Sequence, residues 1–272
     1  MHKRGTPLAL LLLCTLTGAP SWAPAQEARP GASQRPPAGG AHPMHQRGPK
    51  QFSLANSAGA RATLWKPDLG RIPLAIDNGI LTLKGTGVDN YHALVIEQDW
   101  GYLVESIISY HYMRGKPSGR STTELTAARK TRLEIVPQPV PREHHQYETG
   151  ERWGFQVRFD GRPMAAQTLT LETAHGTTLT GISDAEGRID FTFPDDFPSL
   201  IRGERNRTLA AFTLSTRHLA EGTEYISHLQ GEYRPNPRHW RSLGLGVAVA
   251  GIGFAAGGLL TGFGRARREE SA

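Results

Sequence analysis

The chain has 272 residues, 38% of them hydrophobic and 21% charged, and a formal net charge of +6 at pH 7. Its Lys and Arg residues are dispersed along the sequence, which argues against a nucleic-acid-binding protein, because such proteins gather basic residues into one patch or segment. The only cysteine is Cys14, so the rest of the chain has neither disulfides nor cysteine-based metal sites.

Residues 1–25 have the pattern of a secretory signal peptide. Two basic residues precede an apolar core at 8–16 that is too short to span a membrane, and Ala23-Pro24-Ala25 fits the small-residue cleavage site. A lipoprotein signal acylated at Cys14 is disfavoured, because three leucines stand where a small residue is expected. We therefore expect the residues after the cleavage site to be exported.

Residues 26–50 are rich in Pro, Gly, Ala and Gln and have no apolar periodicity, which predicts a disordered linker. The linker contains His42, Met44 and His45, and imidazole and thioether groups suit a copper or nickel ion. We favour a solvated linker, because a flexible site is poorly preorganised for a metal.

Residues 51–136 are predicted to form an N-terminal β domain. Short apolar runs alternate with Gly, Asn and Pro turns, which is typical of an antiparallel sheet. One short helix is expected over 124–129. The apolar runs fall at 62–65, 80–83, 92–96 and 103–108.

Residues 137–233 are predicted to form a second β unit, separated from the first by the proline-rich start of this segment, because proline cannot join a central strand. Several short segments alternate apolar and polar residues with turns between them, which indicates a β-sandwich. The clearest alternating residues are Trp153, Phe155, Val157, Phe159, Leu169, Leu171, Ile189, Phe191 and Phe193.

A turn motif in this unit carries a family resemblance. Residues 160–164 read Asp-Gly-Arg-Pro-Met, and residues 183–191 read Ser-Asp-Ala-Glu-Gly-Arg-Ile-Asp-Phe. In the second stretch, Asp184 can hydrogen-bond the turn backbone and Gly187 can supply a positive φ. Together the two stretches resemble the Ig-like or prealbumin-like sandwich of carboxypeptidase regulatory-like domains, which implies that fold for the second unit.

The wider layout resembles a family of periplasmic proteins related to the accessory subunit of nickel and cobalt uptake systems. The resemblance depends on the signal peptide, the first β unit and the Leu-Glu-Ile-x-Pro bridge at 133–137 that leads into the second unit. It implies an accessory role in transition-metal transport.

Four histidines of the β units are candidate ligands for a nickel, cobalt, copper or iron ion: His92, His111, His144 and His145. His144 and His145 are adjacent, so on a strand they point to opposite faces, and a polar inter-domain loop is the simpler interpretation. His92 and His111 flank apolar strands and could approach each other, although buried or edge histidines explain them as well. We therefore expect no cofactor and keep a metal ion as the alternative.

The C-terminal part is predicted to cross a membrane once. A juxtamembrane segment at 234–242 precedes an uncharged apolar helix at 243–263, which meets the length of roughly 20 residues that a span needs, and a tail at 264–272 follows. Small residues line one face of this helix and predict close packing against a membrane-protein partner or a second copy. They are Gly246, Ala250, Gly253, Gly257 and Thr261.

These features predict an all-β protein with two antiparallel units and one transmembrane helix. We expect the helix to cross the lipid bilayer of a bacterial inner membrane, with the β units in the periplasm and the tail in the cytoplasm. The sequence has no Gly-x-Ser-x-Gly, no His-Glu-x-x-His and no phosphate-binding loop, so we expect no enzyme. The predicted function is binding or scaffolding, as an accessory component of a metal-transport or envelope system; the alternative is a periplasmic metal-binding protein.

Overall fold

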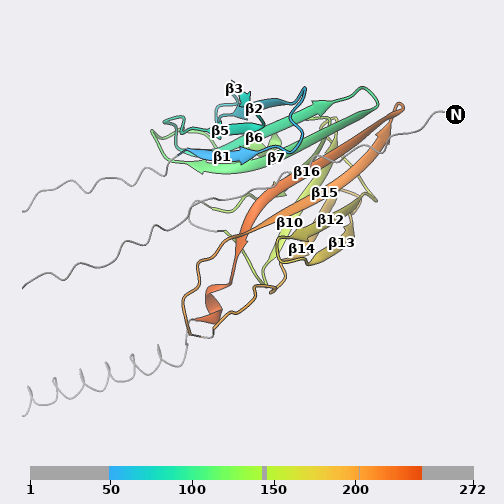
Figure 1. The fold of residues 1–272 in the computed structure, drawn as a ribbon. Helices are drawn as coiled ribbons and strands as arrows, with labels where there is room; N and C mark the ends of the chain where they lie inside the picture. Colours follow the sequence, from blue (N-terminus) through green and yellow to red (C-terminus); the bar gives the residue numbers. More distant parts are fainter. Residues whose placement is uncertain (1–48, 143–145, 202, 241–272) are drawn as a thin grey trace, which may run out of the picture.

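The computed structural model describes residues 49–142, 146–201 and 203–240 (Figure 1). Apart from one short α-helix and a 3₁₀ turn, the regular elements within these ranges are β-strands, as the sequence predicts. The first strand, β1 (Lys50–Ser53), begins at the last residue of the predicted linker, so the linker is shorter than expected at that end.

A nine-stranded sheet runs through the whole fold. Every neighbouring pair is antiparallel except β7–β16 and β9–β16, which are parallel. The order along the sheet is β13 (Thr178–Ile182), β12 (Thr168–Thr173), β15 (Ala210–Ala220), β16 (Thr223–Arg234), β7 (Leu103–Met113), β6 (Asn90–Asp99), β2 (Arg61–Trp65) and β3 (Arg71–Leu74), with β9 (Tyr147–Glu148) beside the end of β16.

A three-stranded sheet covers one face of the long sheet at β2, β6 and β7. It consists of β1, β5 (Ile80–Leu83) and β4 (Ile76–Asp77). Its Leu81 packs with Leu94, Ile96 and Ile107 of the long sheet, and all four side chains are almost fully buried. Figure 1 shows β1 and β5 beside β6 and β7 in this layer.

A four-stranded sheet covers the other face of the long sheet, at β12, β15 and β16. It consists of β8 (Leu133–Gln138), β10 (Arg152–Phe159), β14 (Arg188–Thr192) and β11 (Arg162–Pro163). The predicted alternation is confirmed, because Phe155 and Val157 of β10 are fully buried against Leu171, Leu214 and Leu229. The two covering sheets lie on opposite faces: on β7, Ile107 packs in one core while Val104 and Tyr110, of opposite parity, pack against the other.

The one helix, α1 (Thr122–Ala127), begins two residues before the predicted position. Ser121 and Glu124 form a capping box that fixes its start. Leu125 is fully buried with Trp65 and Val95, so the helix covers part of the long sheet on the face opposite the three-stranded layer.

The predicted boundary between residues 136 and 137 falls inside a strand. Strand β8 continues through Pro137, which is paired in register with Phe155 of β10. The Asp160 N–H donates to Arg132 O, and in an antiparallel pair hydrogen-bonded and non-hydrogen-bonded residue pairs alternate from there. Pro137 falls at a non-hydrogen-bonded position, so its nitrogen faces away from β10 and no backbone hydrogen bond is lost. The long sheet also joins the two predicted units directly, through β7 and β16.

The predicted Asp-Gly turn is confirmed. The Asp184 carboxylate accepts hydrogen bonds from the backbone N–H groups of Glu186 (3.0 Å) and Arg188 (2.7 Å), and Gly187 has a φ of +70°. This turn leads from β13 in one sheet to β14 in the other and therefore fixes how the two sheet edges lie.

Among the described residues, no helix is long and apolar enough to cross a membrane. The predicted signal peptide and the predicted helix at 243–263, with its small residues Gly246, Ala250, Gly253, Gly257 and Thr261, lie outside the described residues.

Candidate binding groove

Two of the four candidate metal ligands, His92 and His111, lie opposite each other on β6 and β7. The His92 Nε2 lies 2.7 Å from Thr86 Oγ1 and its Nδ1 lies 3.0 Å from Asn90 O, while the His111 Nε2 lies 2.8 Å from Ser109 Oγ. Burial lowers the pKa of both imidazoles, that of His111 to about 3, so both rings are neutral at pH 7.

These hydrogen bonds occupy ring nitrogens that a metal ion would need. Within the described ranges, no group of three or more His, Cys, Asp or Glu side chains is arranged to hold a metal. His144 and His145 lie outside the described residues, so a metal site there stays a prediction.

A hydroxyl, an imidazole and a carboxylate meet on the face of β15, β16 and β7. Ser215 Oγ lies 2.7 Å from His228 Nδ1, and His228 Nε2 lies 3.0 Å from Glu105 Oε1. With the ring proton on Nε2, His228 donates to the buried Glu105 and accepts from Ser215, which is the chain of contacts that activates a serine nucleophile. No motif in the sequence marks this group, because Glu105 lies 123 residues before His228 in the chain.

The backbone N–H of Ser215 is engaged in the sheet. The Ala174 N–H donates to Ala211 O and sets the phase of the β12–β15 ladder, so the backbone of Ser215 is paired with Thr170. Its N–H is therefore not available for an oxyanion hole, which such chemistry needs. The group instead links β15 and β16 to β7 across the parallel junction.

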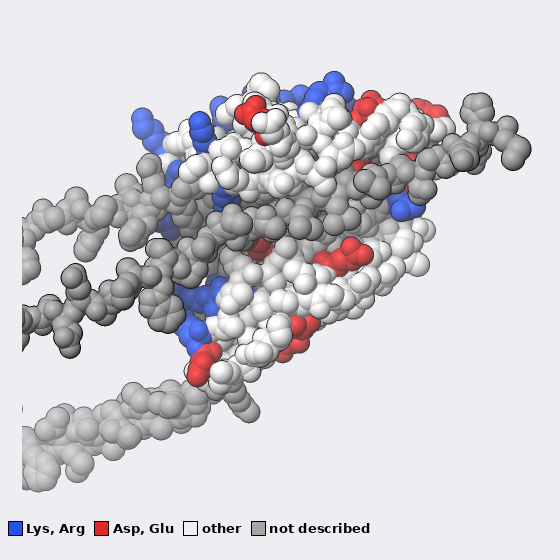
Figure 2. Space-filling model, in the orientation of Figure 1, with Lys and Arg blue, Asp and Glu red and all other residues white. Residues whose placement is uncertain are grey.

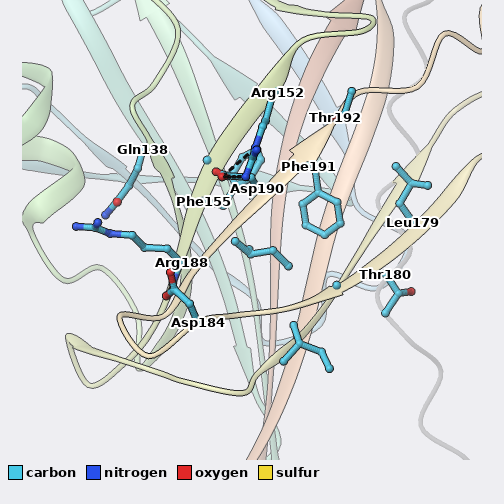
Figure 3. Close-up of a pocket in the computed structure, with 14 residues that line it drawn as sticks. Gln138, Arg152, Phe155, Leu179, Thr180, Asp184, Arg188, Asp190, Phe191 and Thr192 are labelled. Atoms are coloured by element: carbon cyan, nitrogen blue, oxygen red, sulfur yellow. Dashed lines mark hydrogen bonds and ion pairs between the residues drawn. The ribbon is translucent and has the colours of Figure 1, made fainter.

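A groove of about 970 Å³ lies between the outermost strands of the two sheets, β13 and β14 (Figure 3). Figure 3 shows Leu179 and Thr180 on one side of the groove, and Gln138 and Arg188 on the other. Apolar side chains line its inner part, and the Arg152–Asp190 ion pair, at 2.7 Å, lies on the β14 side. The groove therefore offers both apolar and polar contacts.

Both strands that border the groove have one unpaired edge. Hydrogen bonds from Ser183 N–H to Gln167 O and from Thr173 N–H to Thr177 O set the phase of the β12–β13 ladder. The N–H and C=O groups of the intervening residues therefore point away from β12. These outward residues on β13 are Thr178, Thr180 and Ile182. No strand of the described residues pairs with this edge.

The same reasoning applies to β14. The Phe193 N–H donates to Glu151 O and the Val157 N–H donates to Gly187 O, so the backbones of Asp190 and Thr192 point away from β10. Two open strand edges thus run along one groove.

The opposite end of the long sheet is closed to further pairing. The Lys66 N–H donates to Gly70 O, so on β3 the outward positions are Arg71 and Pro73. Proline has no N–H and arginine adds charge, which are two common ways in which proteins protect sheet edges. Strand β13 has neither: residues 177–183 are uncharged and contain no proline, and Ile182 is 67% exposed.

Surface charge does not mark another site on the visible face. In Figure 2, Lys and Arg lie mainly at the upper and left margins and Asp and Glu are scattered, so the uncovered part of that face has no continuous basic surface.

No protein-family model matches the sequence, and no curated protein matches it. Among solved structures, similar chains include a Ca²⁺-stabilised adhesin that helps an Antarctic bacterium bind ice, which is 14% identical with a TM-score of 0.25 over 70% of this chain and 44% of that one. The D0-D1 domain of intimin is 9% identical with a TM-score of 0.23 over 67% and 88%, respectively. The SGBP-B protein from the mixed-linkage glucan utilisation locus of Bacteroides ovatus is 10% identical with a TM-score of 0.17 over 66% and 63%. The chain thus spans less than half of the adhesin.

Proposed function

We propose that this protein is a non-catalytic binding or scaffolding protein, tethered to the bacterial inner membrane by the predicted helix at 243–263, with its β units in the periplasm. In this proposal the second unit is an Ig-like sandwich. The protein serves as an accessory component of a transport or envelope system and binds a polypeptide along the groove between β13 and β14.

One observation carries the binding proposal: the two ends of the long sheet differ. The β3 end has Pro73 at an outward position, whereas the β13 end has unpaired backbone groups and no charged residue. Added strands bind to such an open edge through main-chain hydrogen bonds, and alternate side chains provide specificity. An uncharged edge without a pairing partner would be an aggregation hazard, which favours a functional occupant.

The absence of catalysis is supported by the backbone around Ser215. The Ser215–His228–Glu105 group has its nucleophile and base in contact, but the Ser215 N–H is committed to the β12 ladder. Without this donor for an oxyanion, part of the electrostatic stabilisation that acyl transfer requires is lacking.

The proposal is tested with the tagged full-length chain in its membrane. Thr180→Pro removes one outward N–H without breaking a bond to β12, so the sheet should fold while the edge is blocked. Thr168→Lys is the matched control: it alters an exposed side chain one strand further in. After crosslinking and solubilisation, T180P should lose the captured polypeptides and T168K should keep them. An unchanged set of captured polypeptides in T180P would refute the proposal.

The membrane arrangement has a separate test. A periplasm-dependent reporter enzyme fused at Gly150 should be active in cells. Activity only from a cytoplasm-dependent reporter would overturn the topology. The sequence-based alternative, a metal-binding protein, predicts a stoichiometric ion that is lost on replacing His144 or His145.

A further inference from the structure

We infer that the occupant of the β13 edge is a second copy of this chain, paired antiparallel with the first about a two-fold axis at Thr180. This inference rests on the proposed binding role of the edge and names the partner. A two-fold interface requires a surface that is complementary to itself, and β13 meets this requirement in its backbone, its side chains and its lack of charge.

The backbone of β13 is symmetric about Thr180. Its outward residues are Thr178, Thr180 and Ile182. An antiparallel copy centred on Thr180 places Thr180 opposite its equivalent, and Thr178 opposite Ile182 of the partner copy. All three are outward positions, so these become hydrogen-bonded pairs, and every outward N–H and C=O of the strand gains a partner.

The side chains fit the same register. The Thr180 side chains of the two copies lie opposite each other, and Thr–Thr pairs across antiparallel strands are favourable. Thr178 covers Ile182 of the partner copy, a side chain that is otherwise 67% exposed. On the inner face, Leu179 lies opposite Gly181 of the partner copy, so no bulky side chain opposes it.

Strand β14 does not offer the same match. A two-fold axis at Asp190 would put this carboxylate directly opposite its equivalent, and like charges directly opposite are destabilising. Asp190 also holds the ion pair with Arg152 at 2.7 Å. The inference is therefore specific to the edge of the long sheet.

A five-residue strand makes a small interface, so the pairing depends on local concentration. The predicted tail helix holds copies in one membrane, which converts pairing into an almost intramolecular event, with effective concentrations on the order of millimolar for a short tether. The small-residue face of that helix would act in the same direction.

Cysteine crosslinking of the full-length chain in its membrane tests this register. The only native cysteine, Cys14, is in the predicted signal peptide, so engineered cysteines report alone. Hydrogen-bonded antiparallel partners have Cα atoms about 5.5 Å apart, within the range that a disulfide spans. Thr180→Cys should therefore give a disulfide-linked dimer under mild oxidation, and the control Thr168→Cys should stay monomeric.

A mixed pair fixes the direction of the strands. Thr178→Cys and Ile182→Cys should each crosslink poorly alone, because equivalent residues lie four positions apart, or about 14 Å. Co-expressed copies should form the heterodimeric disulfide. Equal crosslinking of T168C, or T178C linking to itself as readily as T180C, would overturn the inference.

The outcomes separate the two proposals. If T180C stays monomeric while T180P still loses its captured polypeptides, another protein occupies the edge, so the second-copy inference fails and the binding function stands. If T180P also changes nothing, both fail.

Discussion

Replacing Glu134 by Gln should destabilise the fold strongly, because Glu134 is the only anion in a buried cluster of three charges. Its fully buried carboxylate lies 2.6 Å from an Arg158 nitrogen and 3.7 Å from Lys130 Nζ. Arg158 also donates to carbonyl oxygens at the end of α1. The substitution leaves two cations facing each other inside the protein. Breaking a buried pair in this way typically costs about 3–5 kcal/mol of unfolding free energy.

The buried Lys130 ammonium has a free-energy cost of its own, which follows from its pKa. Burial lowers its pKa from 10.5 to about 8, although Glu134 acts in the opposite direction. At about 1.36 kcal/mol for each pKa unit, keeping this side chain charged costs roughly 3 kcal/mol. The folded-state pKa lies below the unfolded one, so the unfolded chain binds more protons between pH 8 and pH 10.5, and stability should rise with pH across that window.

Urea denaturation of the purified protein in mild detergent, followed by tryptophan fluorescence, measures these effects. E134Q should lose about 3 kcal/mol or more at pH 7. The loss should be smaller at pH 9, because Lys130 can then release its proton. The control Lys130→Met should be neutral or stabilising at pH 7 and should lack the rise above pH 8. A loss below about 1 kcal/mol for E134Q, or an unchanged pH dependence in K130M, would refute the reasoning.

Three further predictions concern other parts of the chain. Gly187→Ala should lower the free energy of unfolding by about 2–3 kcal/mol, because φ is +70° and the new Cβ would lie 2.7 Å from a β10 carbonyl oxygen. Gly176→Ala has open space around it and should lower it by only about 1 kcal/mol in the same denaturation assay. A fluorophosphonate probe should leave Ser215 unlabelled by mass spectrometry; labelling would revive a hydrolase. Gly253→Leu with Gly257→Leu should weaken self-association or partner capture in the membrane, and unchanged association would count against the predicted helix face.

The strands could be predicted from the sequence because their signal is local. The alternation at Phe155 and Val157 and the apolar runs at 80–83 and 103–108 mark real strands, since a half-buried strand must alternate its side chains. The turn at Asp184 followed for the same reason: the carboxylate and the backbone that it binds are a few residues apart.

The arrangement of the strands could not be predicted, because it depends on pairing between distant segments. The parallel junction of β7 and β16 leaves no periodic trace in either strand, and Glu105 meets His228 only through it, whereas Ser215 and His228 face each other across the β15–β16 hairpin. The sequence marks only one end of the long sheet, because Pro73 inside a strand indicates a protected edge. The strand at the other, open end depends on topology alone.

The position of β16 has a consequence for biosynthesis. Although it is the last strand that the structure describes, it lies between β15 and β7 rather than at a margin of the sheet. While the polypeptide is being made, β7 keeps a vacant side until residues 223–234 have been synthesised, and its neighbours cannot join the later strands before then. The long sheet is therefore completed only after β16 has been synthesised, so its core forms late.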